Sequence, residues 1–189
     1  MLNIKQGGFN VIKHPSHDAY LLVMESKPHK RGILNHAGGG FDHERGDKNT
    51  IDTATEEGRE ETGLVVRPHT LIARYLYPGE SPVRMHNMYE SEVIDGEIQT
   101  SDEHPFVGYV SLEEILWLGE KGKLRGPAVI ESIQRSREAN YQRENDEVIV
   151  ISEDPHRNAD EMTGIGLNEI WIPKVVEFAG VELGYTENS

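Results

Sequence analysis

Short apolar runs alternate with polar, turn-forming segments along much of the first 110 residues of this 189-residue chain. Runs of this length that are rich in valine, isoleucine, leucine and tyrosine predict β-strands. The polar segment HPSHD at residues 14–18 predicts a turn that joins the first two strands as a hairpin. The predicted strands are residues 9–12, 19–24, 64–66, 71–77, 83–93 and 106–110.

Residues 49–62 carry the clearest helical pattern, with Asn49 or Thr50 able to cap the start. Gly63 stands where a residue in the left-handed conformation commonly ends a helix. Three positions at helical spacing predict a stripe that faces the protein interior: Ile51, Ala54 and Gly58.

Two further helices are predicted downstream of the strands. Ser111 can cap the first, with Glu114 in the capping-box position, and Pro127 fits the first turn of the second. This order of strands and helices favours an α/β fold over an all-α or all-β fold. The composition changes near Asn140, so we expect one domain at residues 1–139 and a C-terminal extension at residues 140–189, packed on the domain or on a partner subunit.

Composition and charge limit the kinds of partner and site that the chain can have. The net charge of −14 disfavours a nucleic-acid polymer as partner, and small anions also need a bridging cation. The absence of cysteine excludes disulfides, thiolate metal sites and a cysteine nucleophile, and it weakly favours the cytoplasm. No apolar run approaches the length of a membrane span, and the start of the chain does not resemble a signal peptide.

The predicted helix at residues 49–62 gathers an unusual amount of negative charge. At 100° per residue, three of its glutamates share one face, next to the predicted inward stripe: Glu57, Glu60 and Glu61. Like charges at this spacing destabilise a helix by a few tenths of a kcal/mol. They are either a solvated face or an oxygen-ligand site for a hard cation such as Mg²⁺.

The sequence around this helix resembles the Nudix box. The family pattern is Gly, five residues, Glu, seven residues, then Arg-Glu-apolar-x-Glu-Glu-x-Gly-apolar, and residues 56–64 read EEGREETGL. Glu57, Glu60, Glu61 and Gly63 match the pattern, and Gly39 matches the box glycine. The resemblance covers about residues 8–138. It implies the Nudix fold, in which a mixed β-sheet is sandwiched between α-helices.

The box departs from the family pattern in three ways. Gly39 and Glu57 are 18 positions apart where the pattern gives 15, so the loop carries about three extra residues, and Glu44 or Asp47 can stand for its glutamate. Glu56 replaces the arginine that orients a helix glutamate in the family. Gly58 replaces an apolar residue. The candidates for the missing positive partner are Arg59, Arg45 and Lys48.

The resemblance implies hydrolysis of a phosphoric anhydride bond with Mg²⁺, for which Mn²⁺ can substitute. The implied metal ligands are Gly39, through its carbonyl, and Glu57, Glu60 and Glu61; the general base is Glu57 or Glu103. Three cations are candidates for binding the phosphates, with plain surface charge as the alternative: Lys30, Arg31 and Arg84. His36 and His86 either face the substrate or are structural, and the second interpretation is favoured.

Three functions remain open at this point. Residues 82–89 and 124–133 are similar to a bacterial NudJ-like subgroup, which implies a nucleoside di- or triphosphate or a related small diphosphate as substrate. The second hypothesis is an ADP-ribose or dinucleotide pyrophosphatase. The third is a catalytically impaired ligand-binding or regulatory domain, suggested by the altered box. Family habit also implies a homodimer.

Overall fold

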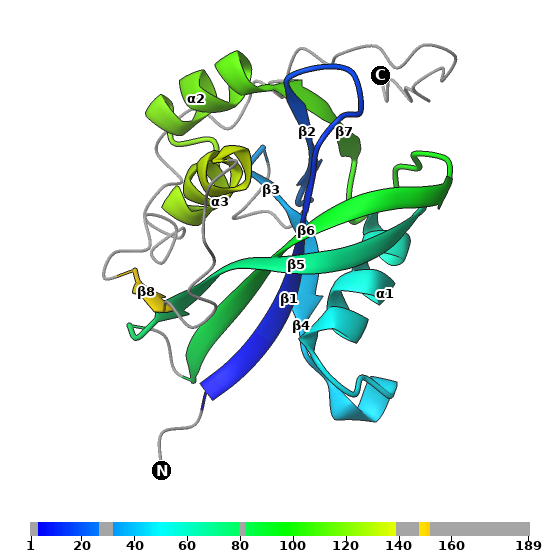
Figure 1. Cartoon of the computed structure of the whole chain (residues 1–189), viewed down its shortest axis with the longest axis vertical. Helices are drawn as coiled ribbons and strands as arrows, with labels where there is room; N and C mark the ends of the chain where they lie inside the picture. Colours follow the sequence, from blue (N-terminus) through cyan, green and yellow to red (C-terminus); the bar gives the residue numbers. More distant parts are fainter. Residues whose placement is uncertain (1–3, 27–31, 80–81, 139–147, 152–189) are drawn as a thin grey trace.

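A mixed β-sheet with helices on both sides forms the centre of the molecule (Figure 1). The structure is a computed structural model and describes residues 4–26, 32–79, 82–138 and 148–151. It confirms the predicted α/β fold with a sheet between helices. The helices are α1 (Thr50–Thr62), α2 (Leu112–Glu120) and α3 (Pro127–Arg137), with the short 3₁₀ helix η2 (His43–Arg45) before α1.

The strands form two sheets. The larger has the order β4-β1-β6-β5-β8 and the smaller the order β3-β2-β7. In the larger sheet β1 runs parallel to β6 and antiparallel to β4. The bounds are β1 (Ile4–Ile12), β2 (Ala19–Met24), β3 (Leu34–Asn35), β4 (Ala37–Gly40), β5 (Leu64–Tyr77), β6 (Val83–Gly96), β7 (Phe106–Ser111) and β8 (Val148–Val150).

The predicted hairpin of the first two strands is wrong. β1 and β2 lie in different sheets. At the turn between them, an isolated antiparallel bridge pairs Lys13 with Tyr20. The reason is that β4 and β6 take both edges of β1, while β3 and β7 take both edges of β2. Local sequence places the turn correctly, but strand partners are chosen by the whole fold.

The two strands predicted at residues 64–66 and 71–77 are one continuous strand, β5. Its register against β6 shifts at three places, one of them between Pro68 and Thr70. Proline has no backbone N–H to give to the ladder, so an irregularity there lets the strand continue past it.

Two apolar clusters lie on different parts of the sheets. The larger fills the space between the five-stranded sheet, β2 and the pair α2 and α3; it includes Tyr20, Tyr75 and Ile133. The smaller joins the three-stranded sheet to β4 and the start of β5 through Leu21, Ala37 and similar residues. Because α1 is absent from both, its attachment to the sheet depends on other contacts.

Part of the predicted extension joins the main sheet. Residues 148–150 form β8, which pairs in parallel with Arg74 to Leu76 of β5. Residues 139–147 and 152–189 lie outside the described residues, so the domain boundary near residue 140 stays a prediction. In the described part of the chain no helix is long and apolar enough to cross a membrane.

Candidate active site

The ends of α1 are set by local sequence, as predicted. Asn49 caps the start, since its side-chain Oδ1 accepts hydrogen bonds from the backbone N–H groups of Ile51 and Asp52 at 2.8 and 3.1 Å. Gly63 ends the helix in the left-handed conformation with φ of 76°, and its N–H donates to the Arg59 carbonyl at 3.0 Å.

The predicted inward stripe of α1 is partly wrong. Ile51 is 44% exposed, whereas the buried residues are Thr53, Ala54, Gly58 and Thr62. The inward face is made of small residues because the helix lies very close to the sheet. A Cβ atom on Gly8 of β1 would stand 1.9 Å from the Thr50 carbonyl oxygen, and one on Gly58 would stand 2.4 Å from Val66. Gly58 therefore allows this close packing.

A buried asparagine ties α1 to the glycine-rich strand. The side-chain amide of Asn10 donates to the carbonyl of Ala54 in α1 at 2.7 Å and to that of Ala37 in β4 at 3.2 Å. The Ser91 hydroxyl donates to its Oδ1 at 2.8 Å. Asn10 is fully buried, so these bonds offset the cost of removing its amide from water.

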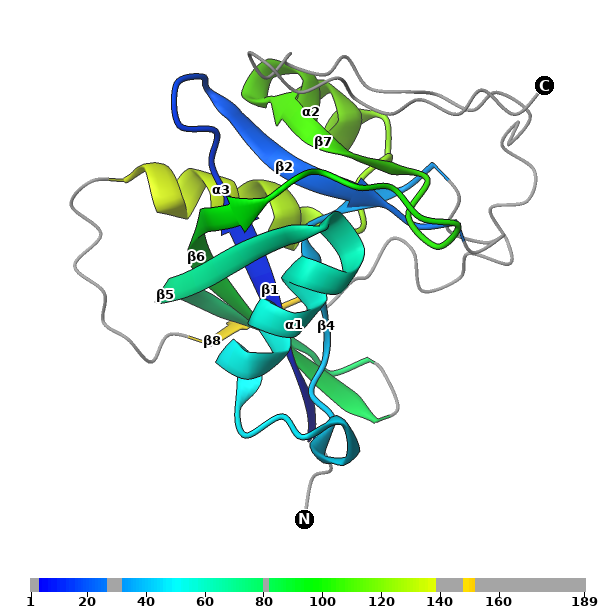
Figure 2. The same ribbon diagram turned by 90° about the vertical axis from the view of Figure 1, so that its right-hand side faces the viewer.

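This packing brings two of the predicted glutamates onto β4, as Figure 2 shows for α1 and β4. The Gly38 N–H donates to Glu61 Oε2 at 2.8 Å. The Glu57 carboxylate fills the space in front of Gly39, where a Cβ atom would come within 2.3 Å of its Oε1. Glu60 lies between them in sequence and is exposed. The structure thus brings Gly39, Glu57 and Glu61 together, with Glu60 on the same helix.

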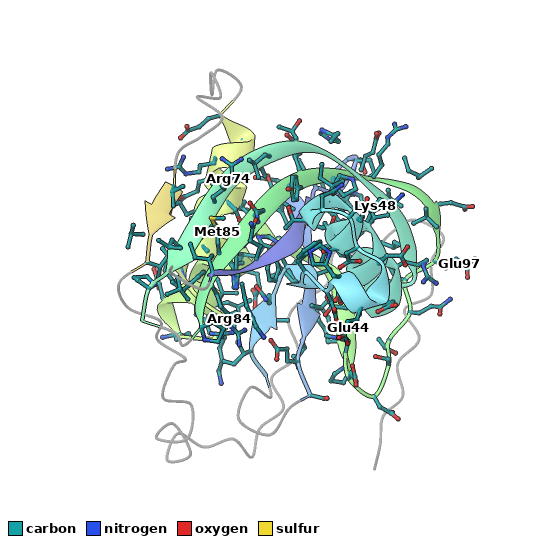
Figure 3. The ribbon with its side chains drawn as sticks, turned by 90° about the horizontal axis from the view of Figure 1, so that it is seen from below. Glu44, Lys48, Arg74, Arg84, Met85 and Glu97 are labelled. Atoms are coloured by element: carbon teal, nitrogen blue, oxygen red, sulfur yellow. The ribbon has the colours of Figure 1, made fainter. Side chains whose placement is uncertain are left out.

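The enlarged loop before α1 contains η2 and is held by Asp47. The buried Asp47 carboxylate accepts from the Asp42 N–H at 3.1 Å and from the Thr53 hydroxyl at 2.9 Å. Of the two candidates for the loop glutamate, Asp47 therefore has a structural role, whereas Glu44 is exposed. Figure 3 labels Glu44 and Lys48 near the start of α1.

The position of the missing arginine lies on the solvent side of α1. Glu56 accepts from Arg59 at 3.0 Å, and their side chains are 56% and 58% exposed. Arg59, one candidate for the missing positive partner, thus pairs with Glu56. A surface pair of this kind contributes at most about 1 kcal/mol to stability.

A histidine from the loop before β7 contacts α1. His104 Nε2 lies 3.2 Å from Glu61 Oε1. The pKa of His104 is raised, first by its hydrogen bond with Glu61, against the opposing effect of burial, with smaller contributions from the charges of Glu61, Glu25 and Glu103. The sequence had pointed to this loop through its acidic stretch but favoured Glu103, and no local pattern distinguishes the histidine. Glu103 is exposed, and its carbonyl accepts from the Ser26 N–H at 3.0 Å.

The predicted phosphate-binding cations are less well defined. Lys30 and Arg31 lie outside the described residues. Arg84 is exposed on β6, paired in register with Lys5 of β1, which places it two strands from β4. Figure 3 shows Arg84 with Arg74 and Met85, away from Glu44 and Lys48. A role for Arg84 in binding phosphate stays a prediction.

His36 and His86, the two histidines considered from sequence, both contact other residues of the fold. His36 is fully buried between β3 and β4, with Nε2 2.9 Å from Ser132 Oγ and 3.3 Å from the Val129 carbonyl oxygen. Burial lowers its pKa to about 4, so it is neutral at pH 7. The ring of His86 contacts the rings of Phe9 and Tyr77 in tilted arrangements, with centroids 4.5 and 4.6 Å away.

The donor atoms of the site suit a hard cation. The carboxylates and the Gly39 carbonyl offer only oxygens, the ligands that Mg²⁺ prefers. Among the residues the structure describes, no group of three acidic or histidine side chains is arranged to hold a metal. The space in front of Gly39 admits a carboxylate because glycine has no Cβ. The ligand types fit Mg²⁺, and the metal set stays a prediction.

Many solved structures resemble this fold. A NUDIX hydrolase from Nitrosomonas europaea has a TM-score of 0.63 at 16% identity, covering 81% of each chain. An ADP-ribose pyrophosphatase from Streptococcus suis has a TM-score of 0.55 at 22% identity, covering 78% of this chain and 98% of that chain. An Ap4A hydrolase from C. elegans has a TM-score of 0.54 at 15% identity, covering 70% and 94%.

These structural likenesses define the class of fold. The protein has the Nudix fold, an α/β fold with a mixed sheet between helices. No family model matches the sequence, and no curated protein matches it. These likenesses, all below 25% identity, therefore establish the fold alone.

Proposed function

We propose that this protein is a Nudix hydrolase that uses Mg²⁺ to cleave a phosphoric anhydride bond in a nucleoside di- or triphosphate or a related small diphosphate. The observation that carries this proposal is the packing of α1 against β4, with Glu61 bonded to the Gly38 N–H and Glu57 filling the space at Gly39. In a purely solvated acidic face these two carboxylates would extend into water, whereas Glu57 is half-buried and the Glu61 side chain is only 14% exposed.

The proposed metal ligands are the Gly39 carbonyl and the carboxylates of Glu57, Glu60 and Glu61. When bound, Mg²⁺ neutralises phosphate oxygens, orients the chain and lowers the pKa of water. Gly39 leaves room for Glu57, because any side chain there would overlap its carboxylate. The Gly38 N–H fixes one oxygen of Glu61. The Gly38 hydrogen bond therefore holds Glu61 in place before substrate arrives, while Gly39 provides the space that the Glu57 carboxylate occupies.

The proton acceptor is Glu57 or Glu103. A general base must reach the attacking water within hydrogen-bond distance. Glu57 is half-buried against Gly39, whereas Glu103 is exposed on a loop whose backbone is bonded to Ser26. To assign the role, each glutamate is replaced by glutamine and kcat is measured as a function of pH. The general base is the residue whose replacement removes the rise of kcat with pH on the acidic side of the profile.

A second candidate function is a dinucleotide or ADP-ribose pyrophosphatase. Two of the similar structures carry such names, the Streptococcus suis and C. elegans proteins. A NudJ-like substrate range, a cytoplasmic location and a homodimer stay predictions. The net charge of −14 supports a small substrate bound through a cation over a nucleic-acid polymer.

A substrate panel with product identification tests the function directly. The purified chain is incubated with nucleoside di- and triphosphates, ADP-ribose and dinucleoside polyphosphates across a Mg²⁺ titration. Release of phosphate or pyrophosphate from nucleotides supports the first function, and release of AMP from ADP-ribose supports the second. No turnover of any compound at any Mg²⁺ or Mn²⁺ concentration would contradict both and favour an impaired ligand-binding domain.

The site is tested by Glu60→Gln, with Glu56→Gln as matched control on the same helix. Glu60→Gln removes a proposed metal ligand and should reduce Mg²⁺-dependent turnover about 100- to 1,000-fold, since its charge would act at the transition state. Glu56→Gln changes the same charge on the solvent side and should retain activity. Equal unfolding midpoints would show that both fold. Retained activity in Glu60→Gln would refute the site.

A further inference from the structure

The loop that carries His104 is anchored at several points. At its start the Gln99 N–H donates to the Thr62 carbonyl at the end of α1, at 2.8 Å. At its far end the Ser26 N–H donates to the Glu103 carbonyl at 3.0 Å. Within the loop, Ser101 and His104 form a tight turn with two hydrogen bonds of 3.0 Å. The backbone of His104 is therefore fixed relative to both α1 and the residues that directly follow β2.

The side chain of His104 is directed at one carboxylate oxygen. Its Nε2 lies 3.2 Å from Glu61 Oε1, and the two side chains are only 12% and 14% exposed. Because an ionised carboxylate only accepts, Nε2 must carry the hydrogen. The other ring nitrogen, Nδ1, is buried and has no hydrogen-bond partner among the residues that the structure describes. Among these residues, the ring is therefore hydrogen-bonded through Nε2 to Glu61.

Glu61 is therefore held from two directions. The Gly38 N–H donates to Oε2, and His104 Nε2–H donates to Oε1. One donor precedes Glu61 in the chain and the other follows it. Two such bonds fix the plane of the carboxylate and leave a second lone pair on each oxygen. On α1 itself, the nearby cation Arg59 pairs with Glu56 on the solvent side and supplies no such contact in the described bonds.

We propose that His104 is a positioning residue that orients Glu61 for metal binding. In the Nudix box pattern an arginine on the helix orients a glutamate, and in this chain Glu56 occupies the position of that arginine. The inference rests on the proposed function, since it concerns a ligand of the proposed Mg²⁺ site. His104 touches neither metal nor substrate in this role. Partners that orient metal ligands typically change metal affinity about 10–100-fold when they are removed.

The test compares His104→Leu with His104→Gln. Leucine keeps a similar volume but has no donor, whereas the glutamine amide can place an N–H near the position of Nε2. Mn²⁺ is used as the probe, and its dissociation constant is measured by electron paramagnetic resonance of the free ion, without substrate. We expect His104→Leu to weaken binding about 10–100-fold and His104→Gln to restore most of it.

His69→Leu is the matched control, because His69 is an exposed histidine on β5 whose described bond is to the neighbouring Thr70 hydroxyl. It should bind Mn²⁺ like the wild type. Ser101→Ala loosens the turn that holds His104 and should give a smaller, few-fold loss with the fold kept. This variant tests the same idea if His104→Leu fails to fold.

The outcomes separate the inference from the proposed function. Wild-type Mn²⁺ affinity in His104→Leu, or an equal loss in His104→Leu and His104→Gln, would overturn the positioning role while leaving the function in place. A wild-type chain that binds no Mn²⁺ would contradict the proposed function and the inference together. A wild-type chain that binds Mn²⁺ but cleaves nothing, with the expected variant pattern, would contradict only the function.

Discussion

The inward and the acidic faces of α1 differ in how much room their residues need. The inward face is made of small buried residues, Ala54 and Gly58 among them, and lies so close to β1 that Gly8 could not carry a Cβ. The acidic face carries long side chains, and two of them reach β4. The first face sets the distance between helix and sheet, and the second uses that distance.

The comparison teaches why an apolar core is not what fixes this site. Neither apolar cluster includes a residue of α1. The helix is instead held by close backbone packing and by Asn10, which bonds to both α1 and β4. A small shift of α1 therefore changes the positions of Glu57 and Glu61 relative to β4. Glu61 is hydrogen-bonded to Gly38 of that strand, and the Glu57 carboxylate lies in front of Gly39.

The largest expected effect is on stability, from Gly8→Ala. The new Cβ would lie 1.9 Å from the Thr50 carbonyl oxygen and 2.9 Å from the Ala54 nitrogen, both backbone atoms that cannot turn aside. We expect the free energy of unfolding to fall by about 3 kcal/mol, measured by urea denaturation. Gly40→Ala is the control, since its Cβ would meet no atom within 4 Å. Unchanged stability in Gly8→Ala would refute the close packing of α1.

Next in size is Gly39→Ala, which should affect activity and spare stability. Its Cβ would overlap the end of the flexible Glu57 side chain, which can move away at little cost. The displaced carboxylate would then be about 1 Å or more from its place, and such a shift can reduce kcat/KM about 100-fold. Activity and urea denaturation are measured together, again against Gly40→Ala. A large loss of stability with normal specific activity would reverse the assignment of the two faces.

A smaller effect is expected from pH at His36, which lies in the chain between β3 and β4 and contacts Val129 and Ser132 of α3. Burial lowers the pKa of His36 to about 4 from 6.5, so below pH 6.5 the unfolded chain binds a proton that the folded chain does not. Stability is therefore full above pH 6.5 and falls as the pH is lowered toward 4, by about 2 kcal/mol between pH 7.5 and 5.

The comparison of wild type with His36→Gln isolates this contribution from those of the other histidines. Urea denaturation at pH 7.5 and at pH 5 gives the free energy of unfolding for each protein. The loss on acidification should be smaller in the variant by about the same 2 kcal/mol. An equal loss in both proteins would show that His36 is not neutral and buried in solution.

Much of the secondary structure could be predicted from sequence, where local chemistry decides it. The Asn49 cap, the Gly63 end of α1 and the Ser111 cap of α2, whose hydroxyl accepts from the Glu114 N–H at 3.2 Å, are all confirmed. Each depends on residues within one helical turn. Such contacts form in the same way whatever the rest of the chain does.

The errors share one cause as well. The hairpin of the first two strands and the inward position of Ile51 both depended on which distant segment would lie alongside. An isoleucine at helical spacing predicts a buried position only if the facing surface has room. Here β1 approaches too closely for a large side chain on the line of contact, which small residues occupy.

The sequence by itself determined the acidic helix, its ends, the glycine-rich segment before it and the absence of arginine at position 56, because each of these features lies within a short segment. Only the tertiary structure decided that Asn10 joins α1 to β4 and that His104, 43 positions after Glu61, donates to its carboxylate. Contacts between distant segments depend on how the sheet orders its strands, and that order follows from the burial and pairing of all of them together.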